Sequence, residues 1–134
     1  MSAMHELGIV EDLLEDAREA MRTQGVATVD GIRAELGDLS NLSREALETA
    51  FRVVARGSEF ADAALEIVDV PGRLRCDPCD VEGSPAEFGF DEARPPPPWL
   101  CPACGYFLRA IEGQGVRFAG LLAHDSSAVE VNVR

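Results

Sequence analysis

The feature that most constrains this chain is a set of four cysteines arranged as two C-x-x-C pairs. Cys76 and Cys79 form the first pair, Cys101 and Cys104 form the second, and the sequence contains no other cysteine. A two-residue gap lets both thiolates of one turn face the same cation, and two such turns supply four sulfurs at tetrahedral corners. The spacing therefore predicts a zinc ion held by four cysteines.

Other uses of the cysteines agree less well with the rest of the sequence. Disulfides are rare in cytosolic chains, and a thioredoxin-like redox motif needs one C-x-x-C pair among alternating strands and helices. Iron binds four thiolates at the same spacing, so a small iron-thiolate electron carrier stays an alternative. Because four thiolates fill a tetrahedral coordination sphere and leave no position for water, we expect a structural metal.

The cysteines lie in a segment, residues 73–113, that differs in composition from the rest of the chain. It holds most of the prolines, including the run Arg94–Trp99, and few periodic apolar residues. We expect metal binding to supply much of its folding free energy, on the order of 10 kcal/mol. The sequence thus predicts an α/β domain formed by residues 1–72 and 114–134, and a zinc-binding domain formed by residues 73–113.

The flanking parts alternate between helix and strand patterns. Apolar residues recur at three- and four-residue steps over residues 4–22 and 44–56, which predicts two amphipathic helices, the second capped by Ser43. Period-two and apolar patterns predict three strands, over residues 28–36, 64–70 and 115–123. Residues 128–133 also alternate and fit either a fourth strand or a tail.

The net charge excludes some classes of partner. The chain has 24 acidic and 12 basic residues and a net charge of −12. Such a surface repels nucleic acid and anionic membranes. No apolar run approaches the roughly 20 residues of a membrane span, and the first residues lack the pattern of a signal peptide. We therefore expect a cytoplasmic protein without nucleic-acid or membrane partners.

The stretch Met4-His5-Glu6-Leu7 opens the first predicted helix and contains one of only two histidines. Ni(II) favours imidazole and other nitrogen donors, so His5 is a candidate ligand. By itself, a lone histidine is more often a surface residue, and Glu6 can simply complement the positive end of the helix. The other histidine, His124, follows the last long strand, and we interpret it as a surface residue rather than as a second nickel ligand.

Several of these features occur in the order that is typical of one family. The chain resembles the HypA/HybF family of hydrogenase maturation proteins, which deliver nickel. The resemblance rests on Met4–Leu7, on Leu36–Ser58, on Leu65–Cys76 leading into the two C-x-x-C pairs, and on residues 115–120. It implies an α+β fold in which two helices pack on a three-stranded antiparallel sheet, with an inserted zinc-ribbon-like domain.

The resemblance also implies sites and partners. It implies that Met4, His5 and Glu6 form a nickel site at the start of the chain, and that the four cysteines bind structural zinc. The implied partners are a maturation GTPase of the HypB type and the large subunit of nickel-iron hydrogenase, while some relatives serve urease. The sequence leaves open whether the chain forms a homodimer.

Two positions depart from the family pattern. Met1, Ser2 and Ala3 precede the motif, whereas family members normally start at the methionine equivalent to Met4. Either translation starts at Met4 or the nickel geometry differs from that of a site built on the terminal amine. Many members also carry an acidic residue at the position of Ser43, so we do not expect an auxiliary acidic ligand there.

The interpretation that combines these features is a nickel metallochaperone for hydrogenase maturation. We expect no enzymatic activity, because the sequence offers no recognisable nucleophile with an adjacent base. The alternative is a zinc-ribbon adaptor that binds another protein and has no nickel role. That alternative shares the zinc prediction and differs only in the role of the chain's first residues.

Overall fold

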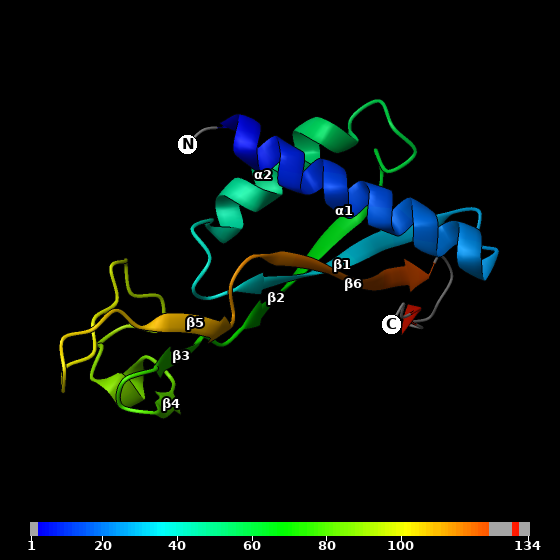
Figure 1. Ribbon diagram of the computed structural model, residues 1–134. Helices are drawn as coiled ribbons and strands as arrows, with labels where there is room; N and C mark the ends of the chain where they lie inside the picture. The colour runs from blue at the N-terminus through cyan, green and yellow to red at the C-terminus, as the bar shows by residue number, and fades with distance from the viewer. Residues whose placement is uncertain (1–2, 124–129, 132–134) are drawn as a thin grey trace. The chain divides into compact units, whose positions relative to one another are not determined.

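The computed structural model describes residues 3–123 and 130–131 (Figure 1). Contacts between Cα atoms divide the chain into two compact units. The helical unit comprises residues up to Glu35, Leu42–Val68 and residues from Val116 onward. The cysteine unit comprises Leu36–Asn41 and Asp69–Gly115. The chain therefore passes between the units several times, and each unit is built from segments distant in sequence.

The helical unit contains two helices and a sheet with the strand order β2-β1-β6-β7. The helices are α1 (Ala3–Gln24) and α2 (Arg44–Ala55). The strands are β1 (Val29–Gly37), β2 (Ala64–Val70), β6 (Val116–Ala123) and β7 (Glu130–Val131). The last residues of β1 and β2 belong to the cysteine unit. The five helices and strands expected on either side of the cysteine segment are all present.

The α+β fold class is confirmed. The sheet of the helical unit contains both parallel and antiparallel strand pairs, whereas the resemblance implied an antiparallel sheet. Helix α2 carries the chain back between β1 and β2, so these neighbouring strands run in the same direction (Figure 1). At their ends, the Asp38 N–H donates to the Val70 carbonyl at 2.9 Å. Strand β6 runs the opposite way (Figure 1), and β7, a short fourth strand within the predicted alternating segment, pairs with it antiparallel.

Both helices cover one face of this sheet (Figure 1). The apolar positions predicted to face inward do so in both helices and in β1. The largest fully buried side chains of the helical unit are Val10, Leu14, Ile32, Leu47, Phe60 and Leu121. The other face is polar, because Arg33 of β1 pairs with Glu66 of β2 at 2.9 Å and Arg117 of β6 pairs with Glu35 of β1 at 2.7 Å.

Helix α2 begins at the residue that the sequence indicates. Ser43 has an extended backbone, and its Oγ accepts a hydrogen bond from the Ala46 N–H at 3.0 Å. This bond satisfies one of the N–H groups that the first turn of a helix leaves without an intrahelical acceptor. The Ser43 side chain thus serves as the N-cap of α2, the helix that connects β1 to β2.

Replacing Ser43 by alanine should destabilise the protein by about 1 kcal/mol, because the Ala46 N–H loses its acceptor. The free energy of unfolding from urea titration measures the effect. Ser43→Asp is the matched control, since its carboxylate can accept the same bond and also complements the helix dipole. A Ser43→Ala protein as stable as the parent would show that the cap contributes nothing.

The loop after α2 is held to α1 by one ion pair. Arg18 donates to Glu59 through Nε at 2.7 Å and through Nη2 at 3.1 Å, and its guanidinium lies 5.5 Å from the centroid of the Phe60 ring. The hydrogen bonds from Arg18 lower the pKa of Glu59 below its ordinary value. A carboxyl whose pKa falls on folding stabilises the protein above its unfolded pKa, and the contribution is lost as the pH drops through the folded pKa.

Glu59→Gln should therefore lower the stability by about 0.5 kcal/mol near neutral pH, a small value because the pair is partly exposed to solvent. Urea titrations at about pH 7 and about pH 3 should show the difference from the parent shrinking as Glu59 becomes protonated. Glu11→Gln, an exposed change on α1, is the control. A difference that persists unchanged at acid pH would contradict the assigned ion pair.

The cysteine unit contains a second, three-stranded antiparallel sheet. Its strand order is β4-β3-β5, with β3 (Arg73–Cys76), β4 (Val81–Gly83) and β5 (Arg109–Glu112). A short 3-10 helix, η1 (Ala86–Phe88), follows β4. These strands are not predictable from the sequence pattern, since each has four residues or fewer. The buried core is small and consists of Leu39, Leu74, Cys76, Cys101 and Leu108.

Candidate metal sites

The cysteine unit brings all four cysteines to one point. The Sγ atoms of Cys76, Cys79, Cys101 and Cys104 all lie within 4.8 Å of one another, the Cys76 and Cys104 sulfurs are 3.5 Å apart, and none of the four forms a disulfide. In a tetrahedral site with Zn–S bonds of about 2.3 Å, the sulfurs lie about 3.8 Å from each other. The donor set and its spacing therefore fit a zinc ion.

Two tight turns position the sulfurs. Cys76 ends β3, and Asp80, with φ +58°, closes the first turn by donating its N–H to the Asp77 carbonyl at 3.2 Å. In the second turn, the Gly105 N–H donates to the Cys101 carbonyl at 2.7 Å. Gly105 has φ +80°, the left-handed conformation that glycine adopts without strain.

The pKa values of Cys76, Cys79 and Cys101 differ without a cation. Backbone N–H groups of Cys104 and Ala103 lower the pKa of Cys101 to about 7. Neighbouring thiols, first Cys104 and then Cys76, raise the pKa of Cys79 to about 12, and burial raises the pKa of Cys76. Four thiolates at this spacing therefore require a bound cation, which is the condition that a metal ion meets.

Charged side chains brace the first turn. Arg75 donates to Asp77 at 2.7 Å, to Asp80 at 2.6 Å and to Glu82 at 3.3 Å, and Arg109 of β5 donates to Asp77 at 2.8 Å. Hydrogen bonds from Arg109 and Arg75 lower the pKa of Asp77 to about 2. The two guanidinium groups also add positive charge beside a centre that would carry two net negative charges as a zinc tetrathiolate. This network was not predicted from the sequence, where the alternation of Arg75 and Asp77 around Cys76 was the available signal.

Cys79→Ser should abolish stoichiometric zinc binding, because three sulfurs no longer close the coordination sphere. With its small core, the cysteine unit should then lose its protease resistance, while far-UV circular dichroism retains the helical signal of α1 and α2. Zinc content by elemental analysis and limited proteolysis measure both effects. Glu92→Ser, an exposed change in the same unit, is the control. A Cys79→Ser protein that keeps one zinc per chain would contradict the assigned ligand set.

The other predicted site lies at the start of α1. The helix begins at Ala3, so Met4, His5 and Glu6 lie in its first turn, and Glu6 is partly buried. The first N–H groups of a helix have no intrahelical acceptor. His124 lies outside the described residues.

Comparisons with known proteins agree with these features. Residues 4–121 match the HypA family, described as hydrogenase/urease nickel incorporation metallochaperones. The chain is 39% identical over 110 residues to the hydrogenase maturation factor HypA of Rhodobacter capsulatus, covering 82% of this chain and 89% of that protein. It is 35% identical over 125 residues to the hydrogenase maturation factor HypA of Roseiflexus sp. (strain RS-1), and the match covers 92% of this chain and 95% of that protein.

The fold is similar to that of a solved structure, the solution structure of the Ni metallochaperone HypA from Helicobacter pylori. The TM-score is 0.62 at 21% identity, and the match covers 89% of this chain and 98% of that one. In the described part of the chain, no helix combines the length and the apolar character needed to cross a membrane.

Proposed function

This chain belongs to the HypA family of metallochaperones for nickel incorporation, and we propose that it carries Ni(II) at Met4, His5 and Glu6 and releases it during hydrogenase maturation. The observation that carries this proposal is the coincidence of two boundaries. The family match begins at Met4, and α1 begins one residue earlier. The motif therefore lies in the first turn of a helix, where backbone N–H groups have no intrahelical acceptor.

The chemistry of Ni(II) supports a site of this kind. Nickel favours imidazole and, in planar geometry, further nitrogen donors. His5 supplies an imidazole, and neighbouring backbone amides of the first turn can supply nitrogens once they are deprotonated. Such a site at a chain end needs no rigid cage. A carrier must also give up its metal, and ligands from one short segment can be released in sequence to an acceptor protein.

The four cysteines are proposed to hold zinc with a structural role. Cys76 and Cys101 are buried, and four thiolates bind zinc without an open coordination position. An ion in this site would be released slowly and at the cost of the fold around it. We therefore assign transport to the start of the chain and stability to the cysteine unit.

Ser43 is not part of the proposed nickel site. Its hydroxyl accepts the hydrogen bond from the Ala46 N–H that begins α2, and a neutral hydroxyl is a weaker nickel ligand than the carboxylate that many relatives carry at this position. We propose that ligation relies on His5 and its neighbours without an acidic residue from the start of α2.

We propose that the protein works with a maturation GTPase of the HypB type and with the large subunit of nickel-iron hydrogenase. The support is the family match and the similarity to proteins named hydrogenase maturation factors. A carrier with an accessible metal needs an acceptor that completes the coordination sphere, and these partners are the ones that the family resemblance implies. A zinc-ribbon adaptor without nickel is the alternative that the next experiment separates.

His5→Ala should abolish stoichiometric nickel binding by the zinc-loaded protein, because the only imidazole of the motif is removed. Zinc content and the circular dichroism spectrum should stay unchanged. Equilibrium dialysis with nickel measures the first quantity. His124→Ala, which removes the other histidine of the chain, is the matched control and should bind nickel like the parent. Equal nickel affinity of His5→Ala and the parent would favour the adaptor.

A further inference from the structure

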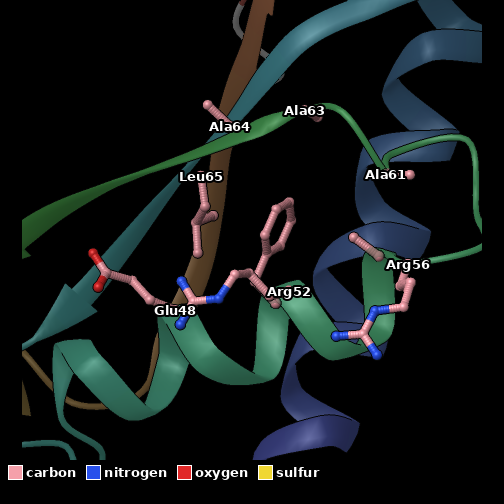
Figure 2. Close-up of a pocket in the computed structure, with 9 residues that line it drawn as sticks. Glu48, Arg52, Arg56, Ala61, Ala63, Ala64 and Leu65 are labelled. Carbon is pink, nitrogen blue, oxygen red and sulfur yellow. The ribbon is translucent and has the colours of Figure 1, made fainter.

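A cavity of about 520 Å³ lies between α2 and the start of β2 (Figure 2). Phe51, Ala55 and Leu65 contribute apolar surface to it. Glu48 and Arg52 of α2, and Arg56 directly after the helix, also line it and follow one another at four-residue steps (Figure 2). The cavity thus combines an apolar wall with two cationic side chains in a row.

The two arginines are unusual in this chain. Carboxylates outnumber basic residues by 24 to 12, and Arg18, Arg33, Arg75, Arg109 and Arg117 all form ion pairs. Among the residues that the structure describes, Arg52 and Arg56 have no carboxylate within ion-pair distance. Arg52 donates only to the Thr49 hydroxyl, at 3.5 Å. Two unpaired guanidinium groups on an acidic protein are complementary to an anionic partner.

The strand beside them ends the sheet. β2 is the terminal strand in the order β2-β1-β6-β7. The Val70 carbonyl accepts from Asp38 at the end of β1, and the Ala64 carbonyl lies against Gly31 of β1. Even-numbered residues of β2 therefore direct their N–H and C=O groups toward β1.

Alternate residues of a strand direct these groups to opposite sides. The backbone N–H and C=O groups of Leu65 and Ile67 accordingly point to the outer edge of β2. The Ile67 carbonyl meets the Arg44 guanidinium there at 3.3 Å. In the part of the chain that the structure describes, the edge at Leu65, which lines the cavity, has no neighbouring strand.

We propose that the free edge of β2 and the cavity beside it form a docking groove for an extended acidic segment of a partner protein. The segment pairs with β2 through backbone hydrogen bonds at Leu65, and its carboxylates pair with Arg52 and Arg56. Addition of a strand to a sheet edge is a common mode of peptide recognition, in which the backbone gives affinity and alternate side chains give specificity. The inference goes beyond the proposed nickel site and does not depend on it.

The spacing of the cationic groups favours a particular sequence in the partner. Alternate side chains of an extended segment lie about 6.6 Å apart on one face, and residues four apart on a helix have Cβ atoms about 6 Å apart. Carboxylates at alternate positions of the segment can therefore meet Arg52 and Arg56 together. Glu48 lies one helical turn before Arg52 and repels a third carboxylate. The next alternate position of the partner segment should therefore be neutral or basic, and this preference fixes the register of the segment on β2.

The test uses a fluorescein-labelled synthetic peptide of about eight residues, a length typical of a strand. Valine alternates in it with polar residues, which are glutamate at two successive polar positions and glutamine at the others. Fluorescence anisotropy with the zinc-loaded protein gives its affinity. Arg56→Gln should weaken binding several-fold, and the double change Arg52→Gln and Arg56→Gln should weaken it at least about tenfold. Arg22→Gln, which removes the same charge near the end of α1, is the matched control and should change the affinity less than about twofold.

A second measurement separates strand addition from simple anion binding. Binding should shift the amide resonances of Leu65 and Ile67, and N-methylation of the peptide backbone on its pairing edge should abolish it, because the ladder hydrogen bonds are lost. Nickel binding should be the same in the arginine variants and the parent, which keeps this test separate from that of the nickel site.

Three results would overturn the proposal. The first is no binding of the peptide at millimolar concentration, and the second is equal binding by the double variant. The third is equal binding of the N-methylated peptide together with displacement by inorganic phosphate, which would identify the cavity as a pocket for small anions.

Discussion

Four sulfur atoms within 4.8 Å of one another are the arrangement on which the cysteine unit depends. Without a cation, backbone N–H groups lower the pKa of Cys101 to about 7, while neighbouring thiols hold the pKa of Cys79 near 12. The surrounding core has only five buried residues, and two of them are cysteines. A bound metal ion removes the repulsion between thiolates and joins two turns that are about twenty residues apart in the sequence. A metal ion bound by the four sulfurs would therefore act as the centre of the core in this unit.

The helical unit has an apolar core of its own. Its apolar side chains pack between two helices and one face of a sheet, and the other face carries ion pairs such as Arg33 with Glu66. A unit with its own core can present a metal-binding segment at its first helical turn without relying on that metal to fold. In this account, one site holds an ion that stabilises the protein, and the other holds an ion that is to be released.

Much of this arrangement could be predicted from the sequence because the patterns are local. The C-x-x-C spacing indicated the cluster, and the step of three and four residues indicated the buried faces of both helices. The short strands β3, β4 and β5 could not be predicted, since their pairing depends on contacts across residues 73–112. The parallel direction of β2, and the cavity that it forms with α2, depend on the crossover of the chain. A pattern in one segment carries no information on that direction.

The central claim is that nickel and zinc occupy separate sites with different ligands. X-ray absorption spectroscopy at the nickel edge tests it most directly, on protein that already contains zinc and has received one equivalent of nickel. The account predicts nitrogen and oxygen scatterers around nickel, with an imidazole contribution from His5 and no sulfur. Sulfur scatterers at the distance of a nickel–thiolate bond, with zinc displaced from the protein, would show that the cysteines bind the transported ion and would contradict the account.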